Sequence, residues 1–360
     1  NKRIKLIMAY TTINKSTAHF DTKLYSGNGG TQTITGLGHQ PDLTWVKSRN
    51  TTDGHSLQDS VRGYGSATKL SSYDNSGENN ASGGSYGNYG YQSASTSDGF
   101  TMVAGSTPGQ NNKSGNNYVA WNWKANGSST TTNNDGATTS YISHNSTGKF
   151  SIIKYTGTGS ATNIGHGLGG TPDYFIVKAR SASDWHVWCN NFPAQKRIKL
   201  NSTGGWSTNT SIFASLPDAT KIYFGSGGDV NGSGVEYICY AWKNVTGFSK
   251  AGSYKGNGNA DGSFVYTGFK PTFLFYRNVS ATENWEMADT QRSPENLDDK
   301  LILYANGTNA DVSTTRFDFL SNGFKARSTN TAVNASGNEY MYLAFGQSIV
   351  GSNNIPATAR

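Results

Sequence analysis

The clearest chemical motif in the sequence is a repeated acid–base pair. Asp59 and Arg62 are separated by three positions, and Asp289 and Arg292 repeat this spacing. A carboxylate beside a guanidinium could bind a substrate or assist proton transfer, but the same pair also braces a turn as a local ion pair. Because the pair recurs at a matched position of an internal repeat, we interpret it as part of the scaffold.

Other motifs that would support catalysis or cofactor binding are incomplete. Residues 165–170 match the Gly-x-Gly-x-x-Gly fingerprint of dinucleotide sites, but a strand-like run follows where that fingerprint requires a helix. Residues 229–234 resemble the start of an EF-hand loop, yet its twelfth position is Tyr240 instead of Glu. The six histidines show no metal-ligand spacing. We therefore predict no enzymatic activity, no cofactor and no metal site.

Aromatic residues outside the predicted strands are the candidates for ligand binding. Tyr86, Tyr89 and Tyr91 lie in a glycine-rich tract, and Trp206 lies in a loop of Gly, Ser and Thr. Aromatic faces stack on sugar rings and on protein partners, so these four residues are predicted to bind a ligand. The alternative is that they fold back onto a neighbouring module or subunit.

Three landmarks recur along the chain and indicate an internal repeat. The first is an Asn-x-Ser-Gly turn followed by an alternating aromatic strand, and the second is a Pro with a basic residue six positions later. The third is an opening strand, at 20–25, 150–155 and 248–254, which precedes a Gly-x-Gly turn. The landmark residues are Ser114, Gly115, Ser233, Gly234, Ser336 and Gly337 for the turn, and Pro41, Lys47, Pro172, Lys178, Pro271 and Arg277 for the strand. The middle copy has Cys189-Asn-Asn-Phe192 in place of the acid–base pair.

The repeats define the predicted fold, which is all-β with three tandem antiparallel β-sandwich (jelly-roll-like) modules. Each copy holds short alternating segments separated by Gly, Asn and Ser turns, and about 100 residues suffice to bury a core. Residues 127–148 are rich in Ser, Thr and Asn and are predicted to be a linker. The predicted segments are 1–18 (an N-terminal docking arm), 19–126, 127–148, 149–245, 246–347 and 348–360 (a C-terminal tail).

Composition excludes several classes of protein. Aromatic residues make up 12% of the chain and charged residues 15%, which is unlike a charge-rich disordered protein. No apolar run approaches the roughly 18 residues of a membrane-spanning helix. The net charge of +7 is dispersed, so we predict a basic surface without nucleic-acid binding. Cys189 and Cys239 could pair or remain free. We expect residues 1–7, which precede Met8, to lie outside the native protein.

Several strings of the sequence resemble a repeat family of structural proteins in marine bacteriophages, including phages of cyanobacteria. They include GLGHQPDLTWVKSR, HSLQDSVRG, YVAWNWKANG, FSIIKYTGTGSATNIGHGLGGTPDYFIVKAR, GSYKGNGNADGSFVYTGFKPTFLFYR and FDFLSNGFKARSTNTAVNASGNEYMYLAF. The resemblance covers nearly all of residues 19–347. It implies a tail-fibre-like virion component, with no catalytic residues to carry over and with a homotrimer as the expected assembly.

These observations predict a non-enzymatic virion protein of fibre or appendage type. Its modules would display loops for recognition of a host-surface glycan, and other virion proteins would be its partners. The predicted location is the surface of the particle, which is assembled in the bacterial cytoplasm, without membrane insertion. The alternative is a capsid decoration or head-fibre protein, and a polysaccharide depolymerase is a third interpretation.

Overall fold

The computed structural model describes residues 10–78, 86–107, 109–294, 296 and 300–350. The predicted all-β class is confirmed, because antiparallel strands dominate the described residues. Helical structure there comprises α1 (Gly228–Asn231), η1 (Ser16–Ala18) and η2 (Tyr86–Tyr89). None of these helices has the length and apolar character that a bilayer crossing requires.

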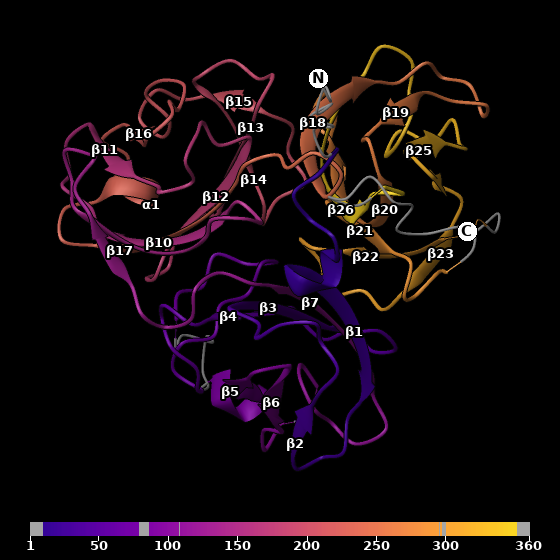
Figure 1. Cartoon of the computed structure of the whole chain (residues 1–360), viewed down its shortest axis with the longest axis horizontal. Helices are drawn as coiled ribbons and strands as arrows, with labels where there is room; N and C mark the ends of the chain where they lie inside the picture. Colours follow the sequence, from indigo (N-terminus) through magenta and orange to yellow (C-terminus); the bar gives the residue numbers. More distant parts are fainter. Residues whose placement is uncertain (1–9, 79–85, 108, 295, 297–299, 351–360) are drawn as a thin grey trace, which may run out of the picture.

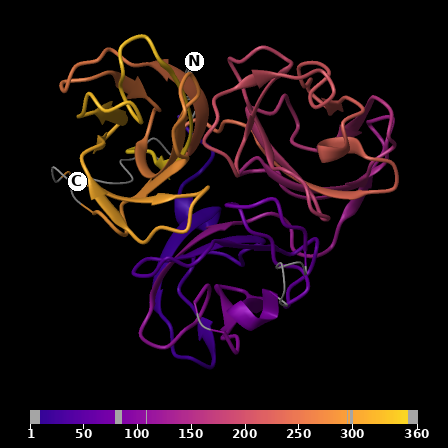
Figure 2. The same ribbon diagram turned by 180° about the vertical axis from the view of Figure 1, so that it is seen from behind.

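The same order of four strands occurs three times and defines three lobes, made of β1–β7, β8–β17 and β18–β26. Figure 1 shows the lobes arranged around a common centre, and Figure 2 shows the same arrangement from behind. The lobe 1 strands are, in order, β1 (Phe20–Ser26), β7 (Asn117–Trp123), β3 (Leu43–Ser48) and β4 (Ser56–Asp59). Their lobe 2 counterparts are β10 (Phe150–Thr156), β17 (Glu236–Trp242), β12 (Tyr174–Ala179) and β13 (His186–Cys189). Those of lobe 3 are β18 (Ser249–Lys255), β26 (Glu339–Gln347), β20 (Lys270–Asn278) and β21 (Glu286–Asp289).

Further strands extend these inner sheets or form a small outer sheet in each lobe. The extensions are β14 (Lys196–Lys199), β15 (Ser207–Thr208), β8 (Thr131–Asn133) and β9 (Ser140–Asn145) in lobe 2, and β22 (Lys300–Tyr304) and β23 (Val312–Thr314) in lobe 3. The outer sheets are β2 (Thr31–Ile34), β6 (Gly99–Val103) and β5 (Tyr91–Thr96); β11 (Thr162–Gly165) and β16 (Lys221–Phe224); and β19 (Phe264–Tyr266), β25 (Gly323–Ala326) and β24 (Phe317–Leu320).

Each inner sheet is buried on both faces, because its strands alternate between two hydrophobic cores. In β17, Tyr240 and Trp242 belong to a core shared by the three lobes, whereas Cys239 and Ala241 belong to the core of lobe 2 alone. The shared core is aromatic. Phe20 of lobe 1 stacks on Phe345 of lobe 3 with ring centroids 4.7 Å apart, and several further aromatic pairs cross between lobes. The lobes are therefore joined by a common interior.

The region expected to be a linker, 127–148, instead contains β8 and β9. Strand β9 pairs with β10 on one side and with β8 on the other, so the region extends the lobe 2 sheet and ends it with β8 as the edge strand. The buried positions of β9 are mostly polar, namely Ser140, Ser143 and Asn145 beside Ile142, which explains why composition alone indicated a loop.

The described part of the N-terminal segment packs onto lobe 3. Ile13 is buried in the shared core, and the backbone N–H of Ser16 donates to Gln347 Oε1 at 2.7 Å. Residues 1–9 and 351–360 lie outside the described residues, and with them the expectation for residues 1–7.

Candidate functional site

The Asn side chain of each Asn-x-Ser-Gly landmark is buried and forms hydrogen bonds with the Gly-x-Gly turn of the same lobe. In lobe 2, Asn231 Oδ1 accepts from the backbone N–H of Thr158 at 2.8 Å, and Asn231 Nδ2 donates to the Ser160 carbonyl at 2.5 Å. Asn112 and Asn334 make corresponding bonds in the other lobes. Backbone φ angles of +82°, +72° and +77° explain the glycines at 115, 234 and 337. Ser114, Ser233 and Ser336 precede these glycines in the same turns.

The basic residues six positions after each Pro are buried cations that bind backbone carbonyls. Lys47 Nζ donates to the Ser48 carbonyl at 2.6 Å, and Lys178 Nζ donates to the Ala179 carbonyl at 2.7 Å. Burial lowers the pKa of each of these two lysines to about 8. Arg277 reaches into lobe 2 instead, where it donates to carbonyls of the loop after β14, and burial lowers its pKa to about 10. Pro41 and Pro172 precede strands β3 and β12, and Pro271 lies in β20 beside a register shift.

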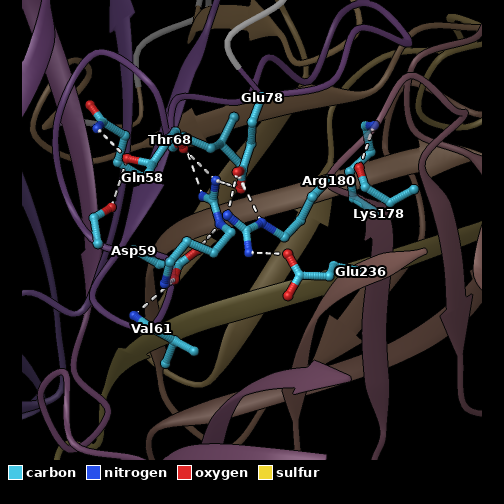
Figure 3. A network of polar contacts seen from close by, with 12 residues as sticks. Gln58, Asp59, Val61, Thr68, Glu78, Lys178, Arg180 and Glu236 are labelled. Atoms are coloured by element: carbon cyan, nitrogen blue, oxygen red, sulfur yellow. Dashed lines mark hydrogen bonds and ion pairs between the residues drawn. The ribbon is translucent and has the colours of Figure 1, made fainter. Parts of the chain in front are cut away.

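A buried ion network joins lobes 1 and 2 (Figure 3). In the turn after β4, Arg62 Nε donates to the Asp59 carboxylate at 2.5 Å, and both side chains are fully buried. Arg62 also contacts Glu78 at 3.0 Å, and Arg180 of lobe 2 contacts the other oxygen of Glu78 at 2.7 Å. Tyr240, also of lobe 2, donates its hydroxyl to Asp59 at 2.7 Å. These charges hold two lobes together.

Electrostatics keep the Arg62 guanidinium charged. Burial alone would lower its pKa, but the carboxylate of Asp59, the Tyr240 hydroxyl and the carboxylate of Glu78 together raise the pKa above its ordinary value. A group held in one charge state is suited to a structural role and unsuited to proton transfer near neutral pH.

The junction of lobes 3 and 1 repeats this network. Arg292 Nε contacts Asp289 at 2.7 Å, and both side chains are fully buried. Asp311 takes the place of Glu78 and is contacted at 2.8 Å by Arg292 and at 2.8 Å by Arg49 of lobe 1. Trp121 of lobe 1 donates its indole N–H to Asp289 at 3.1 Å.

The junction of lobes 2 and 3 has an apolar set of side chains at the corresponding positions. Phe192 occupies the Arg62 position of the motif, and its ring packs edge-on against Trp206 with centroids 4.8 Å apart. In the strand pairing, Leu343 corresponds to Tyr240. The remaining positions are matched by a backbone hydrogen bond that recurs at each junction. The backbone N–H donates to a carbonyl of the next lobe, from Glu78 to Arg180, from Asp311 to Arg49 and from Trp206 to Val279. Trp206 and Val279 therefore stand where the other junctions have an acidic residue and an arginine.

A second set of contacts crosses between lobes next to these networks. Trp185 of lobe 2 donates its indole N–H to the Ser71 carbonyl of lobe 1 at 2.8 Å. Trp285 of lobe 3 donates to the Lys199 carbonyl of lobe 2 at 2.9 Å. His55 fills the matching position in lobe 1. Its Nδ1 accepts from Trp45, which leaves Nε2 as the donor to a carbonyl of lobe 3 at 2.9 Å.

The four aromatic residues predicted to bind a ligand do not form one site. Trp206 packs against the shared core, and Lys196 Nζ lies 4.5 Å from its ring centroid. This packing follows the alternative in which the aromatic folds back onto a neighbouring module. Tyr89 is half-buried with Lys69 over its ring, and Tyr91 is half-buried at the start of β5. The side chain of Tyr86 lies outside the described residues. Ligand binding by the tyrosines remains a prediction.

A cluster of potentially catalytic side chains in lobe 2 lacks the geometry of a nucleophile relay. Ser183 and His186 Nε2 both bond to Asp229, at 2.5 and 2.9 Å. The other imidazole nitrogen, His186 Nδ1, has no hydrogen-bond partner among the described residues, so the hydroxyl is not linked to the imidazole. Cys189 and Cys239 are both buried and free. Across the described ranges, no group of three or more His, Cys, Asp or Glu side chains is placed to hold a metal ion.

The sequence analysis did not identify Glu78 and Arg180 of the first ion network, nor Asp311 and Arg49 of the second. Glu78 and Asp311 lie in loops of different length, so repeat register does not align them. Their partners did carry a signal, since Arg49 and Arg180 each lie eight positions after a landmark Pro, where the third copy has Val279.

Comparison with known proteins identifies a protein family but no individual protein that matches the chain. No curated protein matches the chain, and no solved structure matches it. A family described as "Domain of unknown function (DUF7483)" matches residues 15–348. Since this span contains most of the sequence, the chain belongs to that family.

Proposed function

We propose that the protein is a non-enzymatic structural protein of a bacteriophage particle, of fibre or appendage type, whose rigid lobes present loops to a glycan of the host surface. The virion location rests on the resemblance of residues 19–347 to structural proteins of marine phages. In this proposal, other virion proteins are its partners and the chain assembles as a homotrimer.

The supporting observation is that the acid–base residues serve the junctions between lobes. Asp59, Arg62 and Glu78 are fully or largely buried and are bonded to lobe 2, and Asp289 and Arg292 are used in the same way at the lobe 1 junction. Such groups fix the relative positions of the lobes. A scaffold of this kind can carry variable loops without loss of shape, and loops on a rigid scaffold commonly bind partners.

The test uses purified protein and intact particles. Fluorescently labelled protein is expected to bind host cells saturably and to compete with phage adsorption. Absence of saturable binding, together with normal adsorption of particles that lack the protein, would overturn the proposal.

Imaging of the virion distinguishes the fibre from the alternative, a capsid decoration protein. Density for the three-lobed body on the tail or on a projecting appendage is expected. Density spread over the capsid lattice would favour the alternative.

A further inference from the structure

We propose that a groove between the N-terminal segment, lobe 2 and the link to lobe 3 binds an acidic saccharide. This inference rests on the proposed function, because it names the chemistry that a surface glycan would offer. The groove has a volume of about 520 Å³, which is within the range of small-molecule sites. It is lined by residues 10–12 of the N-terminal segment, by Ser146, Thr147 and Lys149 of the turn after β9, and by residues 244–246 of the link.

The walls of the groove are held in place by contacts outside it. The Tyr10 hydroxyl donates to the Gly268 carbonyl of lobe 3 at 2.8 Å, and the side chain of Thr11 is buried. On the opposite wall, the backbone N–H of Asn244 donates to Asp173 at 2.7 Å. A preformed wall reduces the conformational entropy that the protein would lose when a ligand binds.

The lining has the functional groups that a saccharide requires. Thr12, Ser146, Thr147 and Thr246 are exposed, and their hydroxyls make no hydrogen bond to any described residue. Each hydroxyl can donate and accept, as sugar hydroxyls do. Tyr10 is 40% exposed, so one aromatic surface is also accessible for stacking.

Lys149 determines the charge of the expected ligand. The lining contains no Asp or Glu, and the Lys149 ammonium forms no hydrogen bond or ion pair with the described residues. A carboxylate or sulfate on the sugar would supply the missing partner.

The backbone at Lys149 provides an independent observation. It lies in the turn between β9 and β10 with φ at +52°, in the left-handed region that favours Gly. A lysine there is strained, although Gly would fit the turn without strain. Strained residues are concentrated at binding sites, where the side chain is needed despite its conformational cost.

The test measures binding of an alginate tetrasaccharide, a chain of uronic acids, by calorimetry on the full chain, with neutral maltotetraose as the comparison. We expect saturable binding of alginate and none of maltotetraose. Lys149→Gln should weaken alginate binding about fivefold, as for a partly exposed ion pair, and Thr246→Val should weaken it as well. Lys255→Gln removes one positive charge from an exposed site in lobe 3 and should leave binding unchanged.

Lys149→Gly separates binding from folding. This variant should keep or raise the melting temperature while it loses affinity as Lys149→Gln does. Equal binding by wild type, Lys149→Gln and Lys255→Gln would overturn the inference, as would the absence of alginate binding. If groove variants bind host cells like wild type, the groove inference fails while the proposed function stands. If wild-type protein binds no host surface, the proposed function fails.

Discussion

Replacement of Arg62 by Met tests the role of the buried network between lobes 1 and 2. Arg62 contacts Asp59 at 2.5 Å, Glu78 at 3.0 Å and the Tyr240 hydroxyl at 3.1 Å, and its side chain has no solvent exposure. Met fills a similar volume but leaves the Asp59 carboxylate buried without its cation. Removal of one partner of a buried ion pair costs about 3–5 kcal/mol. We expect a loss of that size in the free energy of unfolding, measured by urea denaturation with tryptophan fluorescence.

Two comparisons show whether that loss arises from the network. Arg292→Met should cost a similar amount, because Arg292 has the same connections at the next junction. The double variant Asp59→Asn with Arg62→Met should be more stable than Arg62→Met alone, since it removes the unpaired charge. A loss below about 0.5 kcal/mol for Arg62→Met, the range of ordinary surface substitutions, would refute the reasoning.

Three further predictions concern single residues. Burial lowers the pKa of His55 well below 6.5, so the unfolded chain binds a proton that the folded chain does not. Unfolding free energy should therefore fall as the pH drops below about 6.5, and a His55→Gln variant with the same pH slope would contradict this. Cys189 and Cys239 should not react with a thiol reagent in the native protein, because both are buried and burial raises the pKa of each thiol. Both thiols should react after denaturation, and fewer than two reactive thiols in the denatured chain would contradict their free state. Trp206→Ala should lower the unfolding free energy by about 2–4 kcal/mol through loss of the Phe192 contact, and unchanged stability would instead favour the ligand-binding role.

The three-fold repetition of the fold could be predicted from the sequence, because residues that recur along the chain make the same contacts in each lobe. Asn231 and its counterparts make the same hydrogen bonds in each lobe, so their spacing is kept along the chain. The spacing of Asp59 and Arg62 likewise reflects a turn that is closed by the pair.

Contacts between lobes were less accessible, because they join residues that are far apart in sequence. Glu78 of lobe 1 and Arg180 of lobe 2 come into contact only when the sheets of these two lobes pack against the shared core. The polar neighbours of Trp206 in the sequence predict an aromatic residue in a loop, whereas its partner Phe192 lies on the other side of strand β14 in the sequence. Strand β9 was missed because its pairing depends on the available edge of β10.

Differential scanning calorimetry tests the central claim most directly, namely that the three lobes share one core and form one body. The account predicts a single transition whose calorimetric and van't Hoff enthalpies agree, and Arg62→Met should shift the whole transition to lower temperature. Separate transitions for the lobes, with only one of them shifted by Arg62→Met, would contradict it.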